Sequence, residues 1–155
     1  MNVAQTSKSK GFTIIEVVLV LAIAGLIFLM VFIALPALQR NQRDTQRKND
    51  MSRLQTAIQN SQSNNRGMLP TFNAAFISGY LTVNGTDSFQ DPDGTAYSFT
   101  QNTTNAFDPT TFVSGKIYYT LGAKCNGEAV ATGAGSSKVA VQYKLEGGGT
   151  ACVNN

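Results

Sequence analysis

The chain carries one long apolar run, from Phe12 to Leu38, in which Glu16 is the single charged residue. As an α-helix this run would be about 40 Å long, and the hydrocarbon core of a bilayer is about 30 Å thick. A removable secretory signal has a shorter apolar core with its small-residue cleavage site behind it, whereas here Gly11 stands in front of the run. The pattern therefore predicts a membrane anchor.

The segment that follows is polar but continues the predicted helix. Residues 39–50 contain no apolar side chain, which predicts polar, partly hydrated surroundings. Oppositely charged residues three and four positions apart favour a helix. These pairs are Asp44 with Lys48, Arg40 with Asp44, and Arg47 with Asp50.

A narrow apolar stripe then returns at helical spacing, formed by Met51, Leu54 and Ile58. Gly67 suits the position just after a helix and Pro70 prevents its continuation. One helix over residues 12–66 would be about 80 Å long. This is more than the rest of the chain can cover, so we expect further copies of the chain to cover it.

Beyond residue 67, short apolar and aromatic segments alternate with turn residues, which is typical of strands. We expect strands within residues 94–101, 116–125 and 138–147, a helical turn or loop over 72–81, and glycine-rich loops at 133–137 and 147–149. The prediction is an α+β fold, with a long N-terminal helix packed on a small antiparallel sheet. Its parts are residues 1–11, an apolar helix over 12–38, a polar to amphipathic continuation over 39–66, and a β-rich head over 67–155.

Charge and composition exclude several classes of function. The net charge is +3, but residues 1–66 carry +5 and residues 67–155 carry −2, so no concentrated basic and aromatic surface indicates nucleic-acid binding. Histidine is absent, which excludes His-dependent triads, and neither a nucleophile elbow nor a phosphate-binding loop is present. We predict that the protein is not an enzyme and holds no cofactor.

The two cysteines are Cys125 and Cys152. With so few ligands a zinc site is not expected, and the pair is better interpreted as one disulfide in an oxidising, extracytoplasmic compartment. Such a bond would stabilise the fold by about 3–4 kcal/mol in the chain-entropy model. The alternative is two unrelated small apolar residues.

The stretch KGFTIIE, residues 10–16, followed by the apolar run, resembles the class III signal of type IV prepilins and pseudopilins. The resemblance covers residues 8–38 in detail and the rest loosely. It implies that residues 1–11 are a leader, that a prepilin peptidase cuts between Gly11 and Phe12 on the cytoplasmic side, and that the same enzyme methylates the new amino group of Phe12.

The resemblance also gives Glu16 a role in assembly. Its carboxylate would pair with the α-amino group of Phe12 on a neighbouring subunit and so set the register of a filament, since an unpaired buried charge is strongly unfavourable. In the alternative interpretation, Glu16 lies at the membrane interface in the first helical turn, where the helix dipole favours an acid.

Gly25 and Pro36 form a second feature, because proline removes a backbone donor from a helix. By resemblance, residues 25–36 would extend on assembly and make the filament compliant. A mild kink tolerated in lipid is the alternative.

The segment DPDGTAY, residues 91–97, is similar to a segment of major pseudopilins in which nearby acids bind calcium. Asp87, Asp91 and Asp93 could supply oxygen ligands. Because this chain lacks the tryptophan and the second proline of that segment, and Asp-Pro-Asp-Gly is a turn sequence, a plain turn is the preferred interpretation.

Together these features predict a structural subunit of a type IV pilus, active in motility or cell adhesion. Its partners would be further copies of itself, the prepilin peptidase, the inner-membrane pilus assembly platform, and the membrane before assembly. A pseudopilin of a secretion or competence system, and an anchored ligand- or DNA-binding protein that never polymerises, are the alternatives.

The orientation in the membrane is ambiguous by charge. Lys8 and Lys10 favour a cytoplasmic N-terminus, but the four basic residues soon after the run (Arg40, Arg43, Arg47, Lys48) favour the opposite topology. The predicted disulfide favours an exterior C-terminal part, and we adopt that orientation: a single-pass precursor with a cytoplasmic N-terminus, and an extracellular filament after assembly.

Overall fold

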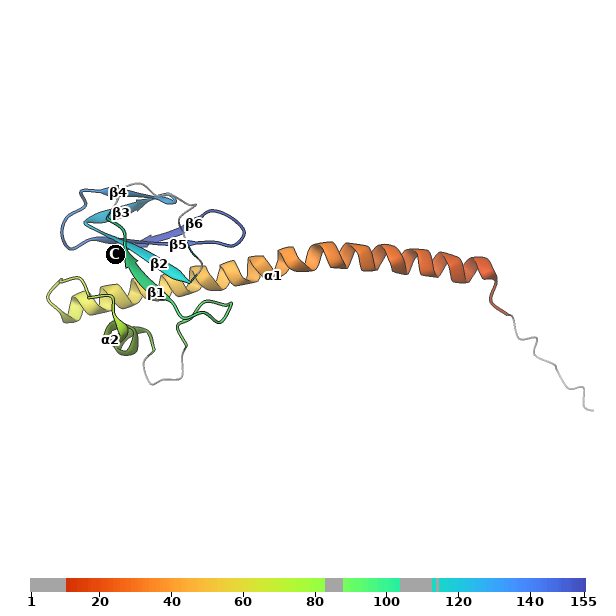
Figure 1. Ribbon diagram of the computed structural model, residues 1–155, viewed down its shortest axis with the longest axis horizontal. Coiled ribbons are helices and arrows are strands. Elements are labelled where there is room, and N and C mark those ends of the chain that lie inside the picture. The colour runs from red at the N-terminus through yellow and green to blue at the C-terminus, as the bar shows by residue number, and fades with distance from the viewer. Residues whose placement is uncertain (1–10, 83–87, 104–112, 114) are drawn as a thin grey trace, which may run out of the picture. The chain divides into compact units, whose positions relative to one another are not determined.

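A computed structural model describes residues 11–82, 88–103, 113 and 115–155 (Figure 1). The chain divides into two compact units, Met1–Leu38 and Gln39–Asn155. The elements confirm the predicted α+β fold, with a long N-terminal apolar helix and a small sheet. They are α1 (Ile14–Asn64), α2 (Ala74–Phe76), the π-helix η1 (Ile77–Leu81), β1 (Ser98–Gln101), β2 (Lys116–Leu121), β3 (Ala123–Asn126), β4 (Ala129–Thr132), β5 (Val139–Lys144) and β6 (Thr150–Asn154).

Helix α1 is unbroken over its 51 residues and includes Pro36. It ends two residues before the predicted Arg66, where Gly67 has a φ of +81° and its N–H donates to the Gln62 carbonyl at 2.7 Å. A left-handed residue with such a bond satisfies the free carbonyls of the last turn. The left-handed position just after the helix, predicted for Gly67, is occupied by Arg66 with a φ of +54°, and Gly67 follows it.

In the first unit, none of the described residues covers the large apolar side chains of α1. Every large apolar side chain from Phe12 to Leu38 is exposed, with exposed fractions between 43% and 90%. Fully burying one such side chain is favourable by about 1.5–3 kcal/mol, so water is a poor solvent for this surface. Among the described residues, α1 is the helix that is long and apolar enough to cross a membrane.

In the second unit, the remainder of α1 packs on the four-stranded sheet (Figure 1). Met51, Leu54 and Ile58 are at most 1% exposed, which confirms the predicted stripe. They contact alternate residues of the central strands, because successive side chains of a strand point to opposite faces of the sheet. The buried sheet residues of this core include Ile117, Val139, Val141 and Tyr143.

The sheet has the strand order β1-β2-β5-β6. The β2–β5 and β5–β6 pairs are antiparallel, in agreement with the expected sheet, but β1 pairs with β2 in parallel, with Phe99 opposite Ile117. A parallel pair requires a crossover between its strands, and most of the chain between β1 and β2 lies outside the described residues. The alternation of apolar and polar residues predicts where strands lie, but it does not predict whether two paired strands run parallel or antiparallel.

A separate two-stranded ribbon, β3–β4, covers the other face of β5 and β6 (Figure 1). Gly127, with a φ of +64°, occupies the hairpin turn between its strands. The predicted disulfide is present: Cys125 in β3 joins Cys152 in β6, with Cα atoms 5.8 Å apart. It ties the ribbon to the edge of the main sheet.

Three strand predictions need correction. The segment 116–125 forms two strands, because Gly122 adopts a φ of +67° between β2 and β3. The segment 94–101 contributes only Ser98–Gln101 as a strand, and the sequence analysis missed β4 and β6. Both missed strands are four or five residues long and lack a clear apolar alternation. The expected helical turn over 72–81 and the glycine-rich loops are confirmed.

The predicted polar, partly hydrated surroundings of residues 39–50 agree with eight exposed residues among the twelve, but one face of the segment is covered. Asp44, Arg47 and Asp50 are 8%, 3% and 5% exposed. Spacings of three and four residues place them on the same face as Met51 and Leu54, so this face of α1 passes from charged to apolar while remaining covered by the head.

The fold predicts that Leu54→Ala destabilises the second unit by about 2–5 kcal/mol, because truncating a buried leucine leaves a cavity. Denaturant unfolding of the full chain in detergent micelles, followed by circular dichroism, measures this loss. Leu121→Ala is the matched control, since Leu121 is 47% exposed and we expect a change of less than about 1 kcal/mol. Equal losses in the two variants would contradict the assigned core.

Candidate functional site

The first candidate site is the start of α1. The backbone N–H and the hydroxyl of Thr13 both donate to Oε2 of Glu16, at 2.8 and 2.9 Å. In return, the Glu16 N–H donates to the Thr13 hydroxyl at 3.4 Å. This reciprocal arrangement is a capping box, which satisfies free N–H groups at a helix start.

Glu16 keeps capacity for a further donor. Both Thr13 bonds reach the same oxygen, and among the residues that the structure describes no donor bonds to Oε1. A shallow hollow next to this carboxylate is lined by apolar side chains and by Glu16 itself; the others are Phe12, Val17, Val20 and Leu21. The helix start thus presents one acidic oxygen beside an apolar surface.

The sequence analysis gave a role to Glu16 and missed Thr13. The signal was available, because Thr13 and Glu16 have the Thr-x-x-Glu spacing of a capping box directly before an apolar run. Gly11 and Phe12 precede the helix and are exposed, with Phe12 at 90%. The predicted cleavage, methylation and register roles of these residues stay predictions.

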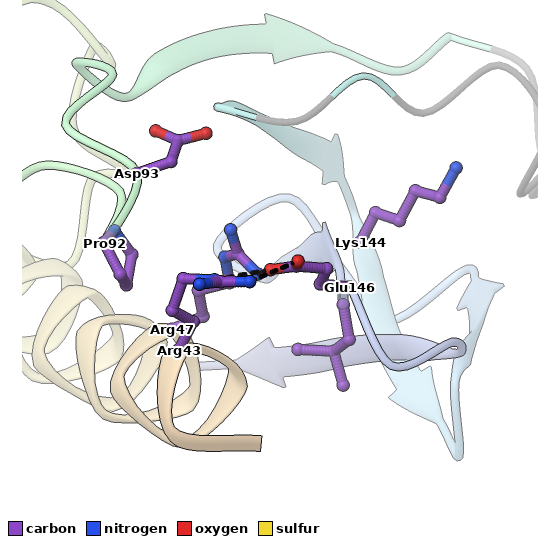
Figure 2. A pocket seen from close by; sticks show the side chains of 7 residues that line it. Arg43, Arg47, Pro92, Asp93, Lys144 and Glu146 are labelled. Atoms are coloured by element: carbon purple, nitrogen blue, oxygen red, sulfur yellow. Dashed lines mark hydrogen bonds and ion pairs between the residues drawn. The ribbon is translucent and has the colours of Figure 1, made fainter. Parts of the chain in front are cut away.

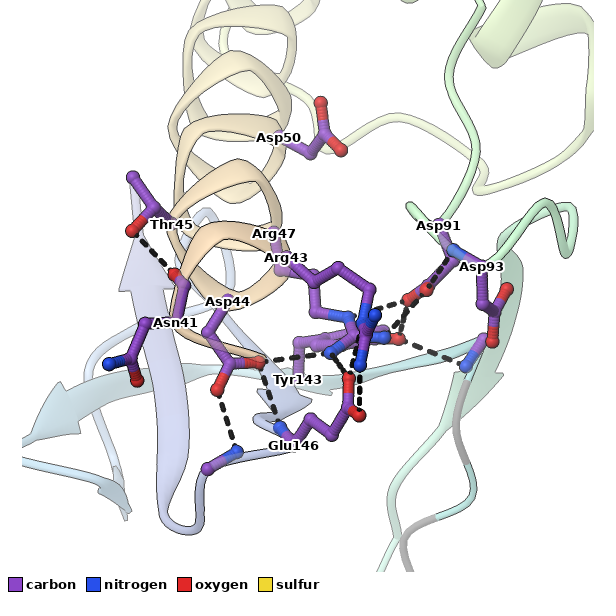
Figure 3. A network of polar contacts seen from close by, with 12 residues as sticks. Asn41, Arg43, Asp44, Thr45, Arg47, Asp50, Asp91, Asp93, Tyr143 and Glu146 are labelled. Atoms are coloured by element: carbon purple, nitrogen blue, oxygen red, sulfur yellow. Dashed lines mark hydrogen bonds and ion pairs between the residues drawn. The ribbon is translucent and has the colours of Figure 1, made fainter. Parts of the chain in front are cut away.

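The second candidate site is a charged network between the stalk part of α1 and the head (Figure 3). Arg47 donates from Nε and Nη2 to the two oxygens of Asp91, at 2.9 and 2.7 Å. Its Nη1 donates to Asp44 at 2.9 Å and to Glu146 at 3.1 Å. The planar guanidinium group suits such bidentate contacts.

Tyr143 and three backbone N–H groups complete this network. The Tyr143 hydroxyl donates to Asp91 and accepts the Gly115 N–H at 3.0 Å. Asp44 accepts the backbone N–H groups of Glu146 and Gly147 at 2.8 and 2.7 Å. One arginine therefore joins α1, the 91–94 turn and the β5–β6 loop.

Arg43 lies at the edge of the network and binds Glu146 with two parallel bonds, of 2.7 and 2.5 Å. Together with Arg47, these side chains form the floor of an open cavity of about 510 Å³ (Figure 2). Asp93 and Lys144 stand on opposite sides of its mouth. The cavity is therefore lined by charged groups of both signs.

The network favours the charged form of its acids. Hydrogen bonds from Arg43 lower the pKa of Glu146 to about 2. Burial opposes ionisation of Asp91, but hydrogen bonds from Arg47 and Tyr143 outweigh it, and the pKa of Asp91 lies below its usual value. Outside the network, burial raises the pKa of Asp50 although Tyr97 and Arg53 donate to it.

The sequence analysis placed Arg47 with Asp50, and Asp44 with Lys48, along the helix. The structure instead pairs Arg47 with Asp44, and Arg53 with Asp50. The burial of Asp44 and Arg47 could have been predicted, because these positions continue the helical spacing of the apolar stripe. Asp91 and Glu146 could not be predicted, since they lie 44 and 99 residues from Arg47.

The segment 91–97 forms the preferred turn, in which the Gly94 N–H donates to the Asp91 carbonyl at 2.8 Å. Both carboxylate oxygens of Asp91 already accept bonds from Arg47. Asp87 lies outside the described residues, so the calcium alternative stays a prediction. Within the described ranges, no three His, Cys, Asp or Glu side chains gather as metal ligands would.

The pKa of Glu146 predicts a pH dependence. Its value falls from 4.5 in the unpaired side chain to about 2 in the fold, so its contribution is present above pH 4.5 and is lost as the pH falls towards 2. We expect Glu146→Gln to unfold more easily at pH 7 and to show a smaller stability loss between these pH values. Urea unfolding by circular dichroism measures both, and an unchanged pH profile would argue against the pairing.

Comparison with known proteins identifies the N-terminal part. Residues 6–32 match the family model described as the prokaryotic N-terminal methylation motif. No curated protein and no solved structure matches the chain. The motif and the apolar helix fit a membrane-anchored precursor. The chain therefore carries a prokaryotic N-terminal methylation motif, in agreement with the resemblance of its KGFTIIE stretch to prepilin signals.

Proposed function

We propose that the chain is the precursor of a type IV pilus subunit. A prepilin peptidase removes residues 1–11, methylates the amino group of Phe12, and leaves a subunit that polymerises through α1. The observation that carries this proposal is the long exposed apolar surface from Phe12 to Leu38, in which Thr13 and Glu16 are the polar residues. The methylation motif at residues 6–32 supports it.

Before assembly, lipid covers this surface; in the filament, the helices of other subunits cover it. Since lipid is already apolar, the transfer gains little from the hydrophobic effect, and packing and polar contacts must direct it. Cleavage creates an ammonium group on Phe12, and the free Oε1 of Glu16 on a neighbouring subunit is its partner. Such a head-to-tail contact uses two different patches, and it builds an open filament when the rotation between subunits does not close a ring.

The orientation we propose places the N-terminus in the cytoplasm and the head outside. The Cys125–Cys152 disulfide supports it, because disulfides persist in oxidising compartments. Arg43 and Arg47, which favour the opposite orientation by simple counting, are paired with Glu146 and Asp91 of the head. These pairs explain why basic residues follow the apolar run although the head lies outside.

Residues 25–36 are proposed to extend during assembly. In the isolated chain they are helical, but Pro36 has no N–H to donate to the Phe32 carbonyl. Gly25 also lowers helix stability relative to alanine by about 1 kcal/mol. This stretch is therefore the weakest part of the apolar helix.

A pseudopilin of a secretion or competence system is the second candidate, because the methylation motif is common to both classes. The amount of the protein on the cell surface distinguishes a pilus subunit from a pseudopilin. A major pilus subunit dominates the material sheared from the cell surface, whereas a pseudopilin stays with the envelope.

The proposal predicts that Glu16→Gln is still cleaved after Gly11 but enters filaments at least about tenfold less than the parent. Removing one partner of a buried ion pair typically costs about 3–5 kcal/mol, and each 1.4 kcal/mol is a factor of ten. Immunoblots of sheared and membrane fractions, with an antibody to the head, measure cleavage and filament entry together.

Glu128→Gln is the control for this experiment, because it is the same substitution on an exposed residue of the β3–β4 turn. We expect it to leave filament entry within about twofold of the parent. Parental filament entry by Glu16→Gln would rule out its pairing with Phe12. An uncleaved parent chain, found only in membranes, would rule out the pilus subunit altogether.

A further inference from the structure

We propose that the buried Arg47 network is an orientation device, which fixes how the stalk segment 39–64 seats on the sheet while adding little net stability. This inference concerns the second unit and is independent of what the filament does. It rests on where the partners of Arg47 come from, on their burial, and on the repeat of the helix face that carries them.

The first argument is the repeat of the buried face. Its positions are spaced alternately by three and four residues, and they are Asp44, Arg47, Met51, Leu54, Ile58 and Ser61. A slip of seven residues along α1 would put Met51 where Asp44 lies and Leu54 where Arg47 lies. After such a slip Ile58 would still fill the place of Met51, but Ser61 and Asn65 would take the places of Leu54 and Ile58. The apolar stripe therefore disfavours a full slip by itself, and the charged residues act together with it.

The charged network adds a second penalty for a displaced helix. In the observed seating Arg47 is 3% exposed and meets Asp44, Asp91 and Glu146. After a slip, Asp91 would face an apolar side chain and remain buried without its partner. An unpaired buried charge is strongly unfavourable, so the wrong seating is penalised although it preserves helical spacing. A single buried polar residue sets register in coiled coils in the same way.

Asp44 adds a constraint along the helix axis. Its two oxygens accept the N–H groups of Glu146 and Gly147. A Cβ on Gly147 would stand 3.0 Å from Oδ2 of Asp44, so the loop approaches α1 closely at this point. Arg47 and Asp44 together define both the rotation and the translation of the stalk against the head.

Burial of the network does not imply that it stabilises the fold. Removing these charges from water is unfavourable, and replacing a complete buried ion pair by neutral groups is often neutral or stabilising. The free energy of folding is then supplied by the apolar core around Met51, Leu54 and Ile58. The free energy of unfolding and the position of the stalk on the sheet are therefore separate properties, and one variant can change the second while preserving the first.

The test is the charge-neutral double variant Arg47→Met with Asp91→Asn. The amide oxygen introduced at position 91 can still accept the Asp93 N–H that the Asp91 carboxylate accepts, and the two substitutions together remove both charges of the Arg47–Asp91 pair. Spin labels on cysteines placed at the exposed positions Gln46 and Lys116 report the distance between stalk and sheet in the full chain in micelles. The native cysteines are joined to each other and take no label.

We expect the double variant to stay folded, because Asp44 keeps the N–H groups of Glu146 and Gly147, and Glu146 keeps Arg43. Its distance distribution should broaden or split into two populations. Arg53→Met is the matched control, because Arg53 pairs with Asp50 outside the Arg47 network, and its distribution should stay narrow. A folded double variant with the parent's narrow distribution would overturn the proposal.

If the double variant does not fold, Arg47→Lys decides the question. Lysine keeps the charge but lacks the fork that spans three carboxylates. Broadening in a folded Arg47→Lys chain supports the seating role, and an unchanged distribution overturns it. Loss of folding in this variant as well would also overturn the proposal, since the network would then be needed for stability itself.

Discussion

The structure depends on one constraint: a single helix must serve two different surroundings. Residues 14–38 of α1 expose every large apolar side chain, whereas the same helix beyond Gln39 buries one face against the sheet. A helix can make this change without interruption, because its backbone groups bond to one another in lipid and in water alike. Only the side chains need to differ between its two parts.

The order of side chains along the buried face follows from this constraint. Charged positions come first, at Asp44 and Arg47, and apolar positions follow from Met51. A continuous apolar face from Phe12 to Ile58 would leave no chemical boundary between the surface left for lipid or other subunits and the surface reserved for the head. The charged network supplies that boundary, because it pairs with Asp91 and Glu146 of the head.

Much of this organisation could be predicted from the sequence because it depends on local pattern. The apolar run and the stripe from Met51 to Ile58 are periodic, and the two cysteines allow one pairing. The parallel β1–β2 pair and the partners of Arg47 depend on contacts between residues far apart in the chain. At the helix start, the Thr-x-x-Glu spacing of Thr13 and Glu16 is a local motif and could also have been predicted from the sequence.

The central claim is that this chain is processed and polymerised, and the mass of the protein sheared from the native cell surface tests it most directly. Intact mass and N-terminal sequencing would identify the first residue and any methyl group on it. The account predicts a chain that starts at N-methylated Phe12 and is abundant in the sheared fraction. A chain that starts at Met1 and is confined to membranes would contradict it.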